Sequence, residues 1–202
     1  MSTLLHIDSS ARFTGSITRQ LSAAYVEQWQ AKNAGGTVVR RDLATQALPH
    51  ISEAMIGAYF TPADQRSPEQ QAIITESDKL VDELFAADIL VIGVPMYNFA
   101  PPSSFKAWID HISRVGRTFK YGENGPVGLL TGKRAIVILS RGGIYSEGPA
   151  QGLEFQGTYI RGVLGFLGIT DVELVIAEGV SKGEEKAKQA IAQAQEQISA
   201  SV

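Results

Sequence analysis

The stretch LLHIDSSARFTGSIT, residues 4–18, runs from an apolar segment through a hydroxyl-rich loop into the start of a helical pattern. Free N–H groups at a helix N-terminus carry roughly half a positive charge, and Ser and Thr hydroxyls donate to anionic oxygens, so this order suits a phosphate. No Gly-Lys-Ser/Thr ending follows, so the lysine that tracks a transferring phosphate is absent. The loop predicts either a phosphate that stays in place or an ordinary polar turn with Ser16 as helix N-cap.

Apolar segments alternate with helical patterns along the rest of the chain. The middle segments are continuously apolar, which is typical of parallel strands buried on both faces. The predicted strands are Leu4–Ile7, Thr37–Asp42, Ile89–Pro95, Arg134–Leu139 and Asp171–Ala177. The predicted helices are Ser16–Ala34, a helix that opens at Ser67, Ser104–Val115, Phe155–Leu167 and Glu184–Ser199.

This alternation predicts an α/β fold in which helices cover both faces of an open parallel sheet. Five strands favour the order 2-1-3-4-5, with the topological switch point between the first and third strands. No linker, repeat or shift in composition divides the chain, so we expect a single domain over residues 1–202. One domain is also the default at this length.

Local signals set several helix ends. Ser67-Pro68-Glu69-Gln70 has the form of a capping box with proline at the first helical position, and Gly35-Gly36 is a typical C-terminal stop. The segment Ser104–Val115 places an apolar stripe on one helix face, which indicates core or a subunit interface. The stripe consists of Phe105, Trp108, Ile109, Ile112 and Val115.

Composition excludes several classes of function. The net charge is −3 and the isoelectric point is near 5.6, so the chain lacks the basic field needed to hold nucleic acid or an anionic membrane. Cysteine is absent, which rules out disulfides, thiolate catalysis and thiolate metal sites. Redox chemistry in this chain would need a borrowed cofactor.

Targeting signals are not apparent in the sequence. The N-terminus has no basic region and its apolar run is too short for a signal peptide, and the longest apolar stretches fall far below the ~20 residues of a membrane span. We therefore expect a soluble, cytoplasmic protein with neither a nucleic-acid nor a membrane partner.

Three loops are predicted to meet at the switch point, because ligands in such sheets bind beyond the carboxyl ends of the strands. The first is Ser9–Thr18. The second, Pro95–Pro102, supplies flat aromatic surface and an amide within a proline-stiffened backbone. The third, Ser140–Gly143, ends in two glycines that let backbone N–H groups approach a ligand, although a plain turn would have the same form. Together they describe a site for a phosphate joined to a flat heterocycle, which is the shape of FMN.

At these residues the chain resembles the FMN-dependent NADH-azoreductases, a branch of the flavodoxin-like NAD(P)H:quinone oxidoreductases. The similarity extends over essentially the full length. The matching pieces are Asp8-Ser9-Ser10, Gly15–Thr18, Pro95–Phe99, Pro101–Lys106, Trp108–Asp110, Phe119–Tyr121, Gly128-Leu129, Ser140–Gly143 and Phe166–Gly168. The resemblance implies a flavodoxin-like three-layer sandwich that binds FMN tightly and takes hydride from NADH or NADPH.

The resemblance also implies where FMN is held. Its phosphate would lie against Ser10, Ser16, Ile17 and Thr18. One edge of its ring would lie along Met96, Tyr97, Asn98 and Phe99, and the pyrimidine end would lie against Ser140, Arg141, Gly142 and Gly143.

A homodimer is implied as well, in which aromatic residues of the partner cover each flavin. The candidates for this cover are Phe60, Phe119 and Tyr121, while Tyr145 is a candidate substrate contact or a plain surface residue. No side chain is expected to act as a nucleophile, because flavin N5 carries the chemistry of a ping-pong hydride transfer to quinones and azo compounds.

Other classes fit the residues less well. His6, His50 and His111 are scattered, and no Gly-x-Ser-x-Gly elbow or His-x-x-Glu-His pair is present, which disfavours a hydrolase or a metal site. We expect His6 and His111 both to be structural rather than catalytic, with His6 inside the first strand and His111 among helix residues with an exposed or interface role. The strand end that carries Asp8 favours hydrogen bonding of its carboxylate within the loop. The first loop lacks the Gly-x-Gly-x-x-Gly of a nicotinamide-binding Rossmann domain.

Two alternatives stay open at this stage. A flavodoxin-like carrier would bind FMN and pass single electrons to protein partners; such carriers tend to be strongly acidic, whereas this chain is nearly balanced. The second alternative is a non-enzymatic binding module that has kept the fold and lost the flavin. Rapid reduction by NADH would exclude the first, and a yellow purified protein would exclude the second.

Overall fold

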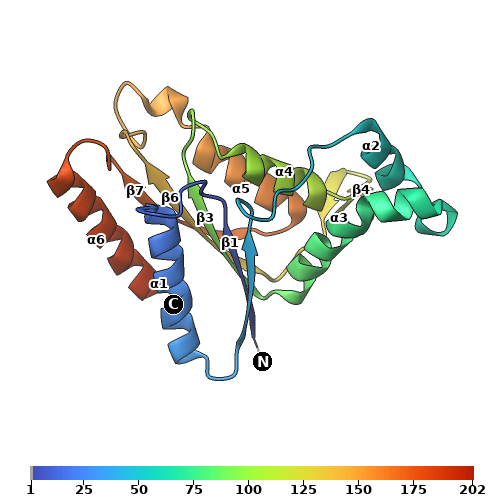
Figure 1. The fold of residues 1–202 in the computed structure, drawn as a ribbon, viewed down its shortest axis with the longest axis horizontal. Coiled ribbons are helices and arrows are strands. Elements are labelled where there is room, and N and C mark those ends of the chain that lie inside the picture. The colour runs from blue at the N-terminus through green and yellow to red at the C-terminus, as the bar shows by residue number, and fades with distance from the viewer. Residues whose placement is uncertain (1) are drawn as a thin grey trace.

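A computed structural model describes residues 2–202, and in it five parallel strands form one sheet between two layers of helices (Figure 1). The order across the sheet is β2-β1-β3-β6-β7, which confirms the predicted 2-1-3-4-5 arrangement. The strands are β1 (Thr3–Asp8), β2 (Thr37–Asp42), β3 (Ile89–Pro95), β6 (Arg134–Arg141) and β7 (Asp171–Glu178).

The helices divide between the two faces of the sheet. One face carries α1 (Ile17–Lys32) and α6 (Glu184–Ser201), which lie side by side in Figure 1. The other face carries α3 (Pro68–Ala86), α4 (Ser103–Ile112) and α5 (Gln156–Leu167). Among residues 2–202, no helix is both long and apolar enough to cross a membrane.

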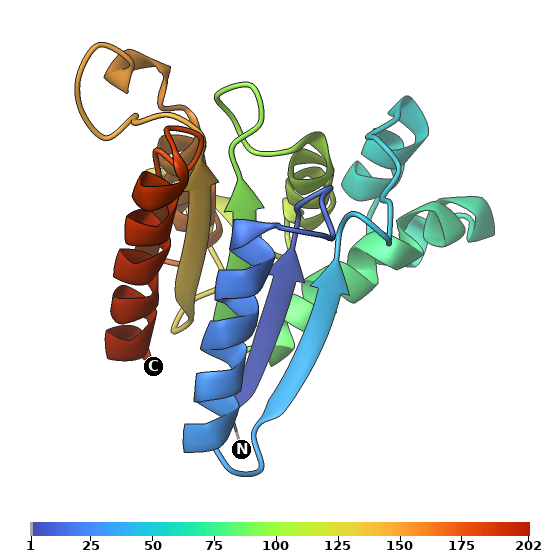
Figure 2. The same ribbon diagram turned by 60° about the vertical axis from the view of Figure 1, so that its left-hand side comes forward.

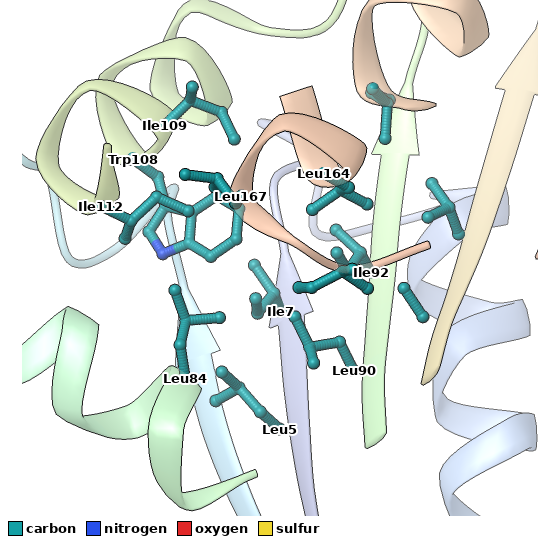
Figure 3. Close-up of a cluster of buried hydrophobic side chains, with 14 of the residues drawn as sticks. Leu5, Ile7, Leu84, Leu90, Ile92, Trp108, Ile109, Ile112, Leu164 and Leu167 are labelled. Atoms are coloured by element: carbon teal, nitrogen blue, oxygen red, sulfur yellow. The ribbon is translucent and has the colours of Figure 1, made fainter. Parts of the chain in front are cut away.

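Alternation along the strands fills both layers of the core. Leu5 and Ile7 of β1 point toward α3, α4 and α5, where they meet Trp108 and Leu164 (Figure 3). Leu4, one residue earlier in the same strand, belongs to the opposite cluster with α1 and α6. Successive side chains of a strand point to opposite faces, so a strand buried on both sides must be apolar at nearly every position. This explains the unbroken apolar runs in the sequence.

Gly93 in β3 permits the close approach of α1 to the sheet. A Cβ at this position would lie 2.8 Å from Asp8 Oδ1 and 3.4 Å from the Thr18 backbone oxygen. The first turn of α1 therefore rests directly on the ends of β1 and β3. Figure 2 shows the loops that leave β1, β3 and β6 at this same end of the sheet.

Most predicted element ends were correct within two or three residues. The capping box before α3 is confirmed: Ser67 Oγ accepts the Gln70 N–H at 3.2 Å, and Gln70 Oε1 accepts the Ser67 N–H at 3.0 Å. The first helix ends earlier than predicted, at Lys32 with Asn33 as its C-cap. The fourth helix also ends early, at Ile112, so Val115 lies beyond it.

Two regions were missed by the sequence analysis. One is α2 (Glu53–Phe60), followed by a short 3-10 turn at Ala63–Gln65. The other is an antiparallel hairpin of β4 (Phe119–Gly122) and β5 (Gly125–Gly128). A second 3-10 turn, Gln151–Leu153, precedes α5. These elements are short and carry no clear periodic pattern.

Candidate functional site

The loops that follow β1, β3, β6 and β7 line a cleft of about 230 Å³ at the carboxyl end of the sheet. We call it the switch-point cleft, because the chain order of the strands reverses between β1 and β3. Its walls consist of Ser10, Arg12, Gly15, Ser16, Ile17, Pro95, Met96, Tyr97, Ser140, Arg141, Gly142, Val180 and Ser181.

Free backbone donors lie at one end of the switch-point cleft. Within residues 2–202, the N–H groups of Gly15, Ser16, Ile17 and Thr18 donate to no acceptor of the chain. The first turn of α1 contains no acidic residue, and Ser16 Oγ accepts the Arg19 N–H as the N-cap. Gly15 has φ +67°, a left-handed conformation that turns the chain into the helix. This end of the cleft is built to receive an anion.

Arg19 holds the first loop in place through its side-chain contacts. Its guanidinium donates to both carboxylate oxygens of Asp42 at 2.8 Å each and to the Ser10 backbone oxygen at 2.8 Å. It also lies 4.8 Å from the centre of the Phe13 ring. Hydrogen bonding to Arg19 is the largest of the effects that lower the pKa of Asp42. The bidentate pair therefore stays charged at neutral pH and ties the loop to β2.

The second loop contains backbone strain. Tyr97 and Ala100 exchange two hydrogen bonds, at 2.9 and 3.1 Å, around Asn98 and Phe99. Both central residues have positive φ, +50° for Asn98 and +71° for Phe99. A phenylalanine in this region costs roughly 1–2 kcal/mol, and such strain is concentrated at functional sites. The turn presents the Tyr97 ring to the cleft.

The Tyr97 hydroxyl joins the first two loops. It accepts the Ala11 N–H at 3.2 Å and lies 3.5 Å from Ser10 Oγ. Ser10 is buried and its hydroxyl also accepts the Arg12 N–H at 3.2 Å. The two walls of the cleft are therefore held together before any ligand binds.

The third loop is attached to the loop after β7. The Val180 N–H donates to the Arg141 carbonyl at 3.2 Å, and the Ser181 N–H donates to the Gly142 carbonyl at 3.1 Å. A Cβ on Gly142 would lie 2.9 Å from Ser181 Oγ, so a larger residue here would displace the Ser181 side chain. Within residues 2–202, neither the Gly142 nor the Gly143 N–H donates to the chain. These two donors are available to a ligand.

The side chain of Arg141 is committed to the structure rather than to the cleft. It is buried and donates to Gln156 Oε1 at 3.0 Å and to Glu154 Oε1 at 2.9 Å. Gln156 in turn donates to the Val94 carbonyl at 2.9 Å, which links α5 to β3. Glu178 lies 3.6 Å from the same guanidinium. Arg141 therefore contributes backbone, and not charge, to the predicted site.

The structure gathers eight of the twelve predicted cofactor-binding residues in the lining of the switch-point cleft. Thr18, Asn98, Phe99 and Gly143 are neighbours of that lining but not part of it. Thr18 is fully buried, with Oγ1 3.4 Å from Ser16 Oγ. Sequence reasoning missed Val180 and Ser181, although a Gly-Val-Ser-Lys-Gly loop after the fifth strand was a usable signal.

The predicted aromatic residues lie elsewhere. Phe60 and Phe119 line a separate pocket of about 200 Å³, which we call the aromatic groove. Phe60 is 70% exposed and Tyr121 is 73% exposed, whereas Phe119 is only 8% exposed. Tyr145 lies beside Gly143 with its ring 6.2 Å from that of Phe99. The full lining of the aromatic groove is Ile51, Ile56, Tyr59, Phe60, Asp110, Ser113, Val115 and Phe119.

Two expectations for individual polar residues were inaccurate. His111 was expected to have a structural role at an exposed or interface position; it is buried instead, and its Nε2 pairs with the Pro49 carbonyl at 2.9 Å, which is a structural contact. Asp8 was expected to bond within its own loop; it accepts the Ser22 hydroxyl of α1 at 3.0 Å. His6 is buried in β1, 3.4 Å from Asp8 and 2.8 Å from Arg40, as its structural assignment predicted.

The topology and the site at the switch point define a flavodoxin-like α/β protein. The family model for the flavodoxin-like fold matches residues 2–202. An azoreductase from Bacillus anthracis strain Sterne aligns with a TM-score of 0.91 and 31% identity, over 98% of this chain and 97% of that one. An FMN-dependent NADH-azoreductase from the Ames Ancestor strain, solved in complex with FMN, aligns with a TM-score of 0.87 and 27% identity, over 98% of each chain.

Sequence similarity narrows this class. The chain is 53% identical over 192 residues to an FMN-dependent NADH:quinone oxidoreductase of Herminiimonas arsenicoxydans, covering 95% of this chain and 94% of the relative. The chain therefore belongs to the family of FMN-dependent NADH:quinone oxidoreductases and azoreductases. It is an enzyme of the flavodoxin-like fold.

Proposed function

We propose that this chain binds FMN in the switch-point cleft and oxidises NADH or NADPH to reduce quinones and azo compounds. The observation that carries the proposal is the cleft itself, in which the N-terminal end of α1, with its free N–H groups, shares one hollow with the Tyr97 ring and with Gly142. The names of the relatives support both the cofactor and the nicotinamide donor. Residues 1–202 would act as one flavin-binding domain, which the match over residues 2–202 supports.

The phosphate of FMN would occupy the N-terminal end of α1. Ser10 and Ser16 would offer hydroxyls, and the N–H groups of Ile17 and Thr18 would point at the phosphate oxygens. A helix N-terminus without acidic residues favours a bound dianion.

The ring would lie along the second and third loops. Met96 and Tyr97 give an apolar wall, and the strained Asn98–Phe99 turn sets their position. The free N–H groups of Gly142 and Gly143 would donate to the pyrimidine end and stabilise negative charge that develops there. Preorganised donors of this kind contribute a few kcal/mol.

Bound FMN would supply the redox chemistry that the side chains lack, namely acceptance of a hydride from the nicotinamide and its delivery to the acceptor. The chain binds and orients the reactants. Donor and acceptor are both flat, so we infer that they occupy the same place in turn, which is a ping-pong scheme. The exposed aromatic side chains of Phe60 and Tyr121 would cover that place in the partner subunit of a homodimer.

Steady-state kinetics test the activity and the scheme together. The purified protein, reconstituted with FMN, should oxidise NADH in the presence of benzoquinone and, separately, of a simple azo dye. Double-reciprocal plots at several acceptor concentrations should give parallel lines. Intersecting lines would contradict the proposal that donor and acceptor use the same binding site in turn. Absence of NADH oxidation with both acceptors would contradict the proposed function.

A further inference from the structure

The lining of the switch-point cleft contains two cationic side chains, Arg12 and Arg141, and no carboxylate. The Arg141 guanidinium is buried, pairs with Glu154 at 2.9 Å and lies 3.6 Å from Glu178. Because two carboxylates already balance its charge, Arg141 adds no net positive charge to the cleft. Within residues 2–202, Arg12 is therefore the one cation of this lining without a carboxylate partner.

Arg19, the next basic residue after Arg12 in the sequence, is also balanced by carboxylates. Its guanidinium donates to both oxygens of Asp42 and lies 3.6 Å from Asp8 Oδ2. A phosphate at the N-terminus of α1 would be met by the helix dipole, which is equivalent to about half a positive charge. Since a phosphate monoester carries a charge of about −2 at neutral pH, the dipole alone leaves it without a full counter-charge.

The loop itself places Arg12 at the phosphate end of the cleft. The Arg12 N–H donates to Ser10 Oγ at 3.2 Å, and the Arg12 carbonyl accepts from the same hydroxyl at 3.4 Å. Arg12 Nη2 lies 3.6 Å from the position that a Cβ on Gly15 would occupy, directly before the N-cap of α1. The side chain is exposed and, in the described part of the chain, its guanidinium forms neither an ion pair nor a hydrogen bond. All of its N–H donors are therefore available beside the free N–H groups at the start of α1.

We propose that Arg12 binds the phosphate of FMN and supplies its counter-charge. This inference rests on the proposed function and adds a binding residue to it. A planar guanidinium donates two parallel hydrogen bonds to phosphate oxygens, while the N–H groups of α1 and the hydroxyls of Ser10 and Ser16 donate to the others. Arg12 holds the charge of a phosphate that does not react, so the loop needs no lysine to follow a transferring group.

The test compares FMN with riboflavin, which has the same ring and lacks the phosphate. The affinity of each flavin is measured from the fluorescence of the flavin that the loaded protein releases on dilution. Arg12→Gln should weaken FMN by about tenfold or more, the loss of charge-assisted hydrogen bonds, and should leave the affinity for riboflavin unchanged. Because Arg12 is exposed, the variant should fold like the wild type, which a thermal melt verifies.

Salt and a conservative variant separate charge from shape. The FMN affinity of the wild type should fall with added potassium chloride more steeply than that of Arg12→Gln, because salt screens an exposed ion pair. Arg12→Lys should recover part of the lost FMN affinity, since lysine keeps the charge without the planar fork. Arg161→Gln removes the same charge from an exposed residue outside the cleft and should change neither flavin's affinity.

Three results would overturn the role of Arg12. Equal weakening of FMN and riboflavin in Arg12→Gln would show that Arg12 supports the loop without contacting the phosphate. Equal weakening of FMN in Arg161→Gln would show a general effect of net charge. Unchanged FMN affinity in Arg12→Gln, together with a KM raised for NADPH and not for NADH, would assign Arg12 to the 2′-phosphate of the nicotinamide cofactor.

Failure of the proposed function would give a different result. A wild-type protein that binds neither flavin would contradict the proposed function, and the role of Arg12 with it. A wild-type protein that binds FMN and riboflavin equally well, and still oxidises NADH, would contradict only the contact between Arg12 and the phosphate.

Discussion

The switch-point cleft and the aromatic groove differ in how their walls are held. The cleft is formed by loops that extend directly from buried strands and are joined by cross-loop hydrogen bonds, such as Ala11 N–H to the Tyr97 hydroxyl. The groove is formed by α2, the end of α4 and the start of β4, away from the central sheet, and it exposes 70% of Phe60. The cleft is preorganised for a ligand by backbone, whereas the groove offers side chains that another molecule can cover.

The largest difference in stability is expected between variants of two residues that line the aromatic groove. Phe119→Ala should lower the free energy of unfolding by about 3 kcal/mol, because Phe119 is 8% exposed and its ring centre lies 4.6 Å from that of Phe166. Phe60→Ala should change it by less than about 0.5 kcal/mol, because Phe60 is an exposed side chain. Urea denaturation of both variants measures the difference.

Measurements of FMN affinity and of NADH oxidation distinguish the two variants further. Phe60→Ala should retain FMN affinity and lose activity if Phe60 covers the flavin of a partner subunit. If Phe60→Ala were as destabilising as Phe119→Ala, the Phe60 ring would stabilise the fold of its own chain. The proposed difference between the preorganised cleft and the exposed side chains of the groove would then be wrong.

In the cleft, Ser16→Asp should weaken FMN by roughly 100-fold, because a carboxylate would face the phosphate across a few ångströms. Aspartate caps helices as well as serine does, so stability should be nearly unchanged. Titration of the apoprotein by flavin fluorescence gives the affinity. Ser52→Asp makes the same change at the N-cap of α2, outside the cleft, and should not affect FMN. Unchanged affinity in Ser16→Asp would place the phosphate elsewhere.

The strands that support the cleft could be predicted from the sequence, whereas the elements that form the groove could not. The five strands were predictable because burial on both faces forces continuous apolar runs, and parallel strands bring their following loops to one edge. The early end of α4 and the hairpin Phe119–Gly128 were not predicted. In the last turn of α4, Ser77 of the distant helix α3 donates to the His111 carbonyl at 2.6 Å. A Cβ on Gly128 would lie 2.1 Å from the Gly168 backbone nitrogen, so the hairpin is positioned by α5 rather than by its own residues.

Polar side chains were the least predictable part of the site. The position of Arg141 at a strand end suggested a ligand contact, yet its guanidinium is taken by Gln156 and Glu154 on the far side of the strand. Residue 141 faces α5 because it follows the same alternation as Leu139. The side of the strand on which the Arg141 side chain lies could be predicted from the sequence, whereas its hydrogen-bond partners could not.

The attachment of the first loop to β2 should depend on pH. Arg19 lowers the pKa of Asp42, so the pair stabilises the fold above the unfolded carboxylate pKa of about 3.9 and loses this effect as the pH falls through the lower folded value. Asp42→Asn should therefore cost about 1 kcal/mol at pH 7 and progressively less below about pH 4. Urea denaturation at several pH values measures it. A cost that is independent of pH would show that charge is not what ties this loop.

The smallest effect should come from the bond that joins the first two loops. Tyr97→Phe removes the acceptor of the Ala11 N–H and should cost about 1 kcal/mol, seen as a several-fold weaker FMN affinity and faster hydrogen exchange at Ala11. Tyr159→Phe is the matched control, because it removes the hydroxyl of a tyrosine that lies in α5, outside the lining of the switch-point cleft. If both variants bound FMN like the wild type, the loops would be held by their own turns, and preorganisation of the cleft would not depend on this contact. If exchange at Ala11 rose while FMN affinity stayed the same, bound FMN would itself complete the wall that the tyrosine holds in its absence.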